Sequence, residues 1–183
     1  MKCSVFIATS ADGFIAKLDG SVDWLHTAGI TDIDMVNQAD MGMADFMASV
    51  DCIIMGRKSM DTISSMNLTQ TQWPYGDTRI IVLSNTIKQA PENLYGKVEM
   101  YSGDIFKLIT TLENEGYKHA YIDGGTTIQA FIRLELINEL TITKAPILLG
   151  EGIPLFGKIV HDIKLKEASA VAFQNDFIQI KYK

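Results

Sequence analysis

The chain has 183 residues, of which 47% are hydrophobic and 21% charged, and its formal net charge is −6. This balance is typical of a globular protein, and the length predicts a single domain over residues 1–183. The acidic charge argues against a nucleic-acid-binding protein, because such domains usually carry an excess of Lys and Arg. A local basic patch could still bind a small anion.

Periodicity predicts strands that alternate with helices, followed by a tail rich in β structure. Such alternation is typical of a parallel sheet with helices on both faces, and a β-rich tail suggests antiparallel strands at one edge. We therefore expect a three-layer α/β/α domain with a mixed, mostly parallel central sheet. In chain order, the elements are strand 2–9, loop 10–20 ending near Trp24, helix 34–50, strand 52–55, a helix from Arg57, strands 79–83 and 98–101, helix 105–115, strand 119–122, a helix from 124–127, and β segments 139–145, 163–173 and 177–182.

The two cysteines, Cys3 and Cys52, lie in apolar runs, so we expect buried thiols in a reducing compartment. The first residues lack the apolar core of a signal peptide, and no stretch reaches the ~20 apolar residues needed to span a bilayer. These features predict a cytoplasmic protein. The three histidines show no metal-ligand spacing with Cys, Asp or Glu, so no metal site is expected.

The first candidate site is a strand-to-helix junction with the sequence CIIMGRKS, residues 52–59. A buried strand ends in Gly56, and two basic residues and a hydroxyl open the next helix. The N–H groups of a helix N-terminus stabilise an anion, Arg57 and Lys58 add positive charge, and Ser59 adds a donor. The alternative is an ordinary turn with solvated basic side chains.

The second candidate site is the junction AYIDGGTTI, residues 120–128. Its paired glycines would let the backbone approach a ligand, and the following helix start could hold a phosphate. The glycines could equally serve tight packing of helix against strand. Neither junction has the GxGxxG or P-loop pattern, so a Rossmann fold is disfavoured.

Five stretches, taken together and in order, resemble the dihydrofolate-reductase-like superfamily. Within it, the chain is most similar to the branch of the C-terminal reductase domain of bacterial riboflavin biosynthesis. The similarity covers nearly the whole chain, and the last stretch is typical of the riboflavin-type branch. The stretches are IATSADGFIA (7–16), IMGRKS (54–59), IVLSN (81–85), IDGGTT (122–127) and PILLGEGIPLF (146–156).

The resemblance implies an NADPH site at the carboxyl ends of the parallel strands. Arg57 would favour NADPH over NADH, because a guanidinium can pair with the additional phosphate. By this resemblance, Ala8 and Ile15 would flank the nicotinamide, Gly56, Arg57, Lys58 and Ser59 would meet the 2′-phosphate and pyrophosphate, Leu83, Ser84 and Asn85 would hold the adenosine end, and Gly124, Gly125, Thr126, Thr127 and Ile128 would meet the pyrophosphate again.

The expected catalytic carboxylate is Asp40. In dihydrofolate reductase a carboxylate on the first helix holds the pterin and assists protonation, and the family spacing, counted back from the first junction, leads to Asp40. On a helix over 34–50, Asp40 lies at the edge of the apolar face beside Met47, whereas Asp45 lies on the solvated face. The alternative is that Asp40 caps a helix that begins near Met41.

Other features leave the substrate open. Trp24 could line the substrate pocket or pin its loop to the core, and Asp23 precedes it where the family has Pro. Ala44 stands where bacterial dihydrofolate reductases have an aromatic residue. The expected substrate contacts are Trp24, Asp40 and Met47.

The resemblance therefore implies an NADPH-dependent reductase of a dihydrofolate- or pterin-like heterocycle. One alternative is a riboflavin-type reductase of a ribosylaminopyrimidine, although the sequence lacks the deaminase motifs that can accompany that activity. Another is a nucleotide-binding module without turnover. The expected partners are a small heterocyclic substrate and, because riboflavin-type relatives pair, a second copy of the chain, with no nucleic acid or membrane.

Overall fold

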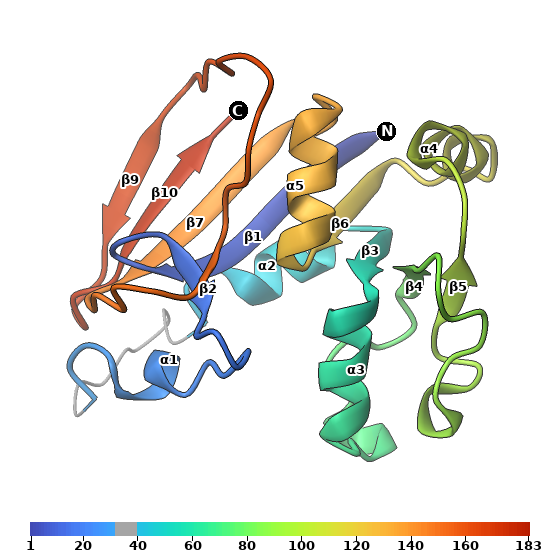
Figure 1. The fold of residues 1–183 in the computed structure, drawn as a ribbon, viewed down its shortest axis with the longest axis horizontal. Coiled ribbons are helices and arrows are strands. Elements are labelled where there is room, and N and C mark those ends of the chain that lie inside the picture. Colours follow the sequence, from blue (N-terminus) through green and yellow to red (C-terminus); the bar gives the residue numbers. More distant parts are fainter. Residues whose placement is uncertain (32–39) are drawn as a thin grey trace.

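The structure is a computed structural model that describes residues 1–31 and 40–183. Parallel strands make up most of its central sheet, and an antiparallel pair completes one edge. The predicted mixed, mostly parallel sheet is confirmed. Its eight strands have the spatial order β5 (Glu99–Tyr101), β4 (Arg79–Leu83), β3 (Cys52–Gly56), β6 (His119–Asp123), β1 (Lys2–Ser10), β7 (Glu139–Ala145), β10 (Ile178–Tyr182) and β9 (Ser169–Ala172) (Figure 1).

Short helices and a small second sheet surround this central sheet. None of the helices in the described part of the chain is long and apolar enough to cross a membrane. The helices are α1 (Trp24–Thr27), α2 (Met43–Ser49), α3 (Arg57–Ser65), α4 (Ile105–Asn114) and α5 (Gly125–Arg133), with 3-10 turns at Gln70–Gln72 and Glu92–Leu94, and the second sheet pairs β2 (Phe14–Ala16) with β8 (Ile153–Pro154).

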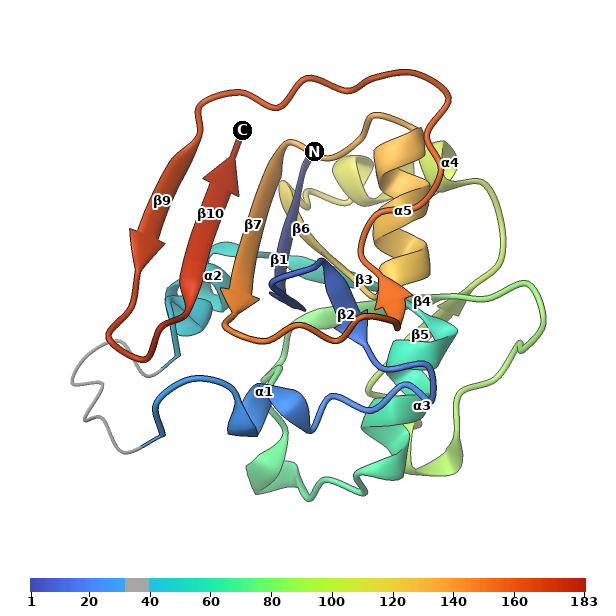
Figure 2. The same cartoon turned by 60° about the vertical axis from the view of Figure 1, so that its left-hand side comes forward.

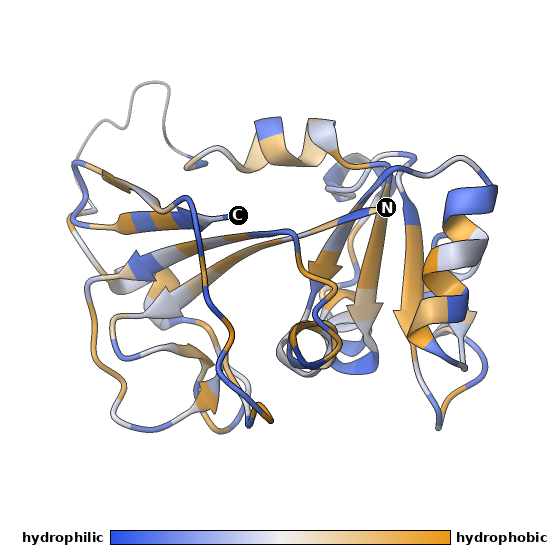
Figure 3. Ribbon diagram, turned by 90° about the horizontal axis from the view of Figure 1, so that it is seen from above, coloured by the Kyte–Doolittle hydropathy of each residue, from blue (hydrophilic) through white to orange (hydrophobic). Residues whose placement is uncertain are grey.

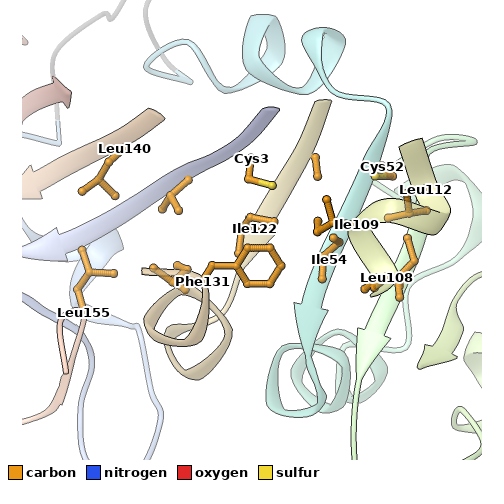
Figure 4. Packing of buried hydrophobic residues seen from close by; sticks show 14 of the residues in the cluster. Cys3, Cys52, Ile54, Leu108, Ile109, Leu112, Ile122, Phe131, Leu140 and Leu155 are labelled. Atoms are coloured by element: carbon orange, nitrogen blue, oxygen red, sulfur yellow. The ribbon is translucent and has the colours of Figure 1, made fainter. Parts of the chain in front are cut away.

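The core lies on both faces of the sheet, because successive strand residues point to opposite faces. In β3, Ile54 packs toward α4 and α5, whereas Ile53 and Met55 pack toward α2. Figure 4 shows the side chains that pack around Ile54 between the sheet and the helices α4 and α5. In Figure 3 the strands on the right-hand side are largely hydrophobic, whereas those on the left mix hydrophobic and hydrophilic residues. Ile54 and Ile122 are fully buried, and each such side chain contributes about 2 kcal/mol relative to exposure.

The predicted helix over 34–50 is confirmed over Met43–Ser49 and wrong over residues 40–42. Met41 has φ 51° and Gly42 has φ 86°, so two successive residues adopt the left-handed region, which a right-handed helix cannot contain. The helix α2 therefore begins only at Met43. The predicted stretch 34–39 lies outside the described residues.

The tail differs from its prediction in one segment. The strand expected over 163–173 is confined to β9, which pairs with β10 only over Ser169–Ala172. Glu167 has φ 48°, and because a strand requires negative φ, an extended segment cannot continue through this residue. β10 and β7 lie within their predicted segments, and β9 forms the outer edge of the sheet (Figure 2).

Candidate functional site

The two predicted junctions meet at the carboxyl edge of the sheet. β3 lies between β4 and β6, and all three run parallel, so their carboxyl ends are neighbours. Gly56 pairs with Leu83, and Met55 pairs with Asp123. The stretches predicted to hold the cofactor thus come together although they are far apart in the chain.

Glycines allow the two junctions to approach each other closely. A Cβ on Gly124, which has φ +86°, would lie 2.5 Å from Oγ of Ser59. A Cβ on Gly56 would lie 2.8 Å from Oγ1 of Thr127. Both distances are shorter than real Cβ contacts, so a side chain at either position would displace the hydroxyl group of the opposite junction. Gly56 and Gly124 therefore allow the two junctions to pack closely and also leave their backbone N–H groups without a covering side chain.

The helices that leave these junctions begin without a side-chain cap. α3 follows Gly56 and α5 follows Gly124, and neither helix has a side-chain hydrogen bond at its N-cap or an acidic residue in its first turn. By contrast, the carboxylate of Asp104 accepts a hydrogen bond of 3.0 Å from the N–H of Lys107 at the start of α4. The N–H groups at the starts of α3 and α5 can therefore bind an anion.

The basic residues at α3 differ in their contacts. Arg57 donates from Nη1 to Oδ2 of Asp61 at 2.7 Å, one helical turn along, with 40% of its side chain exposed. Exposed pairs of this kind are weak, so Arg57 can exchange this carboxylate for another anion at low cost. Lys58 is exposed at the same helix start.

The predicted adenosine contacts lie at the next strand end. Ser84 is buried, and its Oγ accepts hydrogen bonds from the N–H groups of Thr86 at 3.3 Å and Ile87 at 3.0 Å, which forms the turn after β4. Asn85 is exposed, and its Oδ1 accepts from Ser102. The β3–β4 pairing places this turn beside Gly56.

The loop after β1 reaches over the start of α5. A Cβ on Gly125 would lie 2.5 Å from Cδ1 of Ile15, so these two predicted cofactor residues are in contact. Asp12 fixes the loop: its carboxylate accepts from Oγ of Ser10 at 2.6 Å and from the N–H of Gly150 at 2.7 Å. These hydrogen bonds lower the pKa of Asp12.

The predicted pyrophosphate contacts in α5 have different surroundings. Thr126 is exposed at the helix start. Thr127 is buried beside Gly56, and Ile128 is fully buried in the core. The backbone N–H groups of this turn, together with Thr126, are therefore better placed for a ligand than the side chain of Ile128.

A cavity of about 510 Å³ opens at the carboxyl ends of β1 and β7. Ala8, which is predicted to flank the nicotinamide, and Thr143 come from these strands. The remaining walls come from the segment after Trp24, from the start of α2 and from the turn between β9 and β10. The lining residues are Phe6, Ala8, Leu25, His26, Ala28, Ile30, Thr31, Asp40, Met41, Thr143, Asn175 and Phe177.

Asp40 lines this cavity, but it precedes α2 instead of lying on a helix face. Its Oδ2 accepts from the N–H of Ala44 at 2.7 Å, and its Oδ1 accepts from the N–H of Gly42 at 3.1 Å. These hydrogen bonds lower the pKa of Asp40. These contacts are those of a residue that caps the start of a helix, which was the alternative interpretation of Asp40. Because α2 begins after Asp40, the argument from a helix face over 34–50 does not apply. The substrate role of Asp40 stays a prediction.

The other two predicted substrate contacts are packed into the protein. Trp24 is only 2% exposed and belongs to a cluster with Phe173 and Phe177, so it pins its loop to the sheet. Met47 packs against the cluster around Phe46. Neither side chain lines the cavity among the described residues, although the two residues after Trp24 do.

A further chemically distinctive residue is Asp123, whose side chain is assigned no role by the sequence motif that contains it. Asp123 ends β6 within the second junction and pairs with Met55 of the first. The hydroxyl of Tyr121 lies 3.2 Å from Oδ1 of Asp123 and 3.0 Å from the carbonyl oxygen of Phe6. Burial raises the pKa of Asp123, although hydrogen bonds from Ser59 and Tyr121 oppose this effect. The sequence signal that could identify Asp123 is its position as an acidic residue at the C-terminal end of a buried strand, where ligands bind in α/β sheets.

Known proteins resemble the chain over its whole length. The family model described as "RibD C-terminal domain" matches residues 2–179. The uncharacterized protein YwjB of Bacillus subtilis (strain 168) is 29% identical over 183 residues, which cover 99% of this chain and 97% of that protein. A putative riboflavin biosynthesis protein from Shewanella sp. PV-4 is 37% identical, with a TM-score of 0.88 over 100% of this chain and 98% of that one.

A solved structure with lower sequence identity supports the fold of this chain and no more than the fold. It is the diaminohydroxyphosphoribosylaminopyrimidine deaminase/5-amino-6-(5-phosphoribosylamino)uracil reductase of Thermotoga maritima, which is 13% identical with a TM-score of 0.67. The match covers 100% of this chain and 56% of that chain. The dihydrofolate-reductase-like fold predicted from the five stretches is therefore confirmed.

Proposed function

Because this chain belongs to the RibD C-terminal domain family, we propose that it is an NADPH-dependent reductase that transfers hydride to a small heterocycle. The observation that carries this proposal is the pair of uncapped helix starts, α3 and α5, in a sheet that also has a cavity of about 510 Å³ at the carboxyl ends of β1 and β7. Helix starts of this kind bind phosphates, and a cavity of this size accommodates a small heterocycle.

The residues at the junctions fit the proposed cofactor. The glycines at 56 and 124 leave the backbone N–H groups open, and the space between the junctions would be filled by a Cβ at either position. Arg57 would pair with the 2′-phosphate in exchange for Asp61. The turn after β4 would hold the adenosine end, because it is the neighbour of the first junction.

When bound, NADPH supplies the hydride, and the protein supplies position and electrostatics. Ala8 lies in the wall of the cavity and Ile15 lies against the start of α5, so the two would border the space where cofactor and substrate meet. With its lowered pKa, Asp40 acts as an acceptor for substrate N–H groups. Asp123, whose pKa burial raises, is the better placed carboxyl to hold a proton near the junctions.

The proposal is tested by NADPH and NADH titrations followed by turnover assays. The substrates would be dihydrofolate, a panel of pterins and ribosylaminopyrimidines. We expect NADPH to bind more tightly than NADH and to be oxidised with at least one of these compounds. Absence of NADPH binding contradicts the proposal, and NADPH binding without turnover on any compound favours the nucleotide-binding module.

A further inference from the structure

The hydroxyl group of Tyr121 lies within hydrogen-bond distance of two oxygen atoms but has one hydrogen to donate. Its oxygen is 3.0 Å from the carbonyl oxygen of Phe6 and 3.2 Å from Oδ1 of Asp123. A backbone carbonyl accepts and never donates, so the contact with Phe6 is a hydrogen bond only when Tyr121 donates to it. The contact with Asp123 is then a hydrogen bond only if the carboxyl group of Asp123 is protonated and donates to Tyr121.

The carbonyl group of Phe6 lies where β1 no longer pairs with β6. The pairing of these two parallel strands runs from Lys2 to Ser4 of β1, and Tyr121 is the partner of Ser4. If Asp123 is ionised and takes the hydrogen of Tyr121, Phe6 loses this donor beside a buried side chain, which costs free energy. If Asp123 is protonated, a chain of donors from Asp123 to Tyr121 to Phe6 satisfies both contacts. The geometry therefore favours the protonated carboxyl group.

The described groups around Asp123 provide no positive charge that would hold it ionised. Its carboxyl group accepts hydrogen bonds from Ser59 of α3 and from the N–H of Gly124, which a protonated carboxyl group can also do through its carbonyl oxygen. Tyr75, from the segment before β4, stays a neutral hydroxyl, because burial, together with any negative charge on Asp123, raises its pKa to about 12. In the part of the chain that the structure describes, no Lys, Arg or His forms an ion pair with Asp123. Burial therefore raises the pKa of Asp123 without an opposing cation.

We propose that Tyr121 is a positioning residue that holds Asp123 as an uncharged hydrogen-bond donor where the two junctions meet. Asp123 directly precedes Gly124, the N-cap of α5, and pairs with Met55 of the first junction. An ionised carboxylate here would repel the phosphates that these helix starts are proposed to bind, whereas a protonated carboxyl group would not. The effect on the cofactor rests on the proposed function, but the protonation of Asp123 does not.

The protonation is tested by a carbon-13 NMR titration of the aspartate carboxyl groups in the full chain without NADPH. The Asp123→Asn variant identifies the signal of Asp123. We expect this signal to titrate at a higher pH than that of Asp12, whose pKa is lowered by its hydrogen bond from Ser10. A carboxyl group of Asp123 that ionises together with Asp12 overturns the inference.

The role of Tyr121 is tested by the same titration in Tyr121→Phe. This variant removes the acceptor of the protonated Asp123 and leaves Phe6 without its donor in both states, so the Asp123 midpoint should move to lower pH. Tyr101→Phe is the matched control, because the hydroxyl of Tyr101 also donates to a backbone carbonyl, that of Asp104, at 2.9 Å. It should leave the Asp123 midpoint unchanged. An unchanged midpoint in Tyr121→Phe, or one at higher pH, overturns the positioning role.

The consequence for the cofactor is tested by calorimetric titration of NADPH at one pH below and one pH above the Asp123 midpoint. Between these pH values the wild-type chain should lose roughly 2- to 5-fold more affinity than Asp123→Asn, because the like charge develops in the wild type alone. Asp45→Asn, which removes an exposed carboxylate in the first turn of α2, is the matched control and should behave as the wild type. Equal pH dependence of the wild type and Asp123→Asn overturns the effect on the cofactor. Absence of NADPH binding at both pH values contradicts the proposed function, and the NMR titration still decides the protonation of Asp123.

Discussion

The helices α3 and α5 begin at uncapped glycine junctions, whereas α2 and α4 begin beside carboxylates of their own chain. The same unpaired N–H groups occur at every helix start. Where Asp40 or Asp104 accepts hydrogen bonds from these groups, the partial positive charge of the helix start stabilises the fold through that carboxylate. At the starts of α3 and α5 no side chain caps the first turn, so this charge can stabilise a bound anion.

This difference divides the site into two parts. The part around α3 and α5 lacks a capping carboxylate and carries Arg57 and Lys58, so it suits the phosphates of a nucleotide. The part around α2 contains Asp40 and apolar walls. Family membership identifies the reductase fold, and under the proposed function the nucleotide would occupy the first part and the heterocycle the second.

The largest expected effect on NADPH affinity comes from adding a side chain at one of the junction glycines. Gly124→Ala places a methyl group 2.5 Å from Oγ of Ser59 and forces alanine into a positive-φ conformation (φ 86°, ψ 132°) that costs roughly 1–3 kcal/mol. We expect the hydroxyl of Ser59 to be displaced into the space where the cofactor would bind and NADPH affinity to fall by about 100-fold or more, which corresponds to about 2.8 kcal/mol. Calorimetry measures the affinity, and urea unfolding measures the stability.

The matched control for this change is Gly116→Ala. Gly116 has φ +97° but nothing within 4 Å of its Cβ position, so the control carries the backbone strain without the contact. It should lose stability and keep its NADPH affinity. Equal loss of affinity in both variants would show that strain, and not the approach of the two junctions, is responsible.

The next effect concerns the choice between cofactors. Arg57→Ala removes a charged hydrogen-bond donor worth about 1.5–3 kcal/mol, so NADPH affinity should fall by roughly 10- to 100-fold while NADH affinity changes little. Arg133→Ala, an exposed arginine in the last turn of α5, is the control. Equal losses for NADPH and NADH would remove Arg57 from the 2′-phosphate.

A smaller effect, of opposite sign, is expected at the partner of Arg57. Asp61→Asn frees the guanidinium from a pair worth about 0.3–0.5 kcal/mol, so NADPH affinity should rise by roughly 2-fold and NADH affinity should stay the same. The double variant Arg57→Ala/Asp61→Asn should show no such gain. A gain that persists without Arg57 would mean that Asp61 acts on the cofactor directly.

The smallest effect on binding is expected at a closed helix start. Asp104→Ala removes the cap of α4 and should cost about 1 kcal/mol of unfolding free energy without changing NADPH affinity. Asp104→Asn keeps an acceptor at the same position and should retain most of the stability. Any change in NADPH affinity in either variant would contradict the assignment of this helix start to stability alone.

The parts of the site that local sequence could predict are the two junctions. Each combines a buried strand, a glycine and a helix start within a few residues, so the local pattern points to Gly56 and Gly124. Their proximity follows from parallel pairing, which the alternation of strands and helices predicted. The strand end at Leu83 is predicted only by the resemblance to the dihydrofolate-reductase-like superfamily.

The cavity could not be predicted in the same way. Its polar groups come from segments that only tertiary structure brings together, as when Gln179 contacts Thr143 and Met41. The helix pattern over 34–50 also concealed the left-handed turn at Met41, so Asp40 was placed on a helix that begins after it. Apolar periodicity does not report a backbone conformation set by Gly42 and by distant hydrogen bonds.

The most direct test of this account is amide hydrogen exchange with and without NADPH. We predict slower exchange at Gly56–Ser59 and at 124–127, where α3 and α5 begin, and unchanged exchange at the capped starts of α2 and α4, including Ala44 and Lys107. Unchanged exchange at both uncapped junctions in the presence of saturating NADPH, or equal protection at all four helix starts, would contradict it.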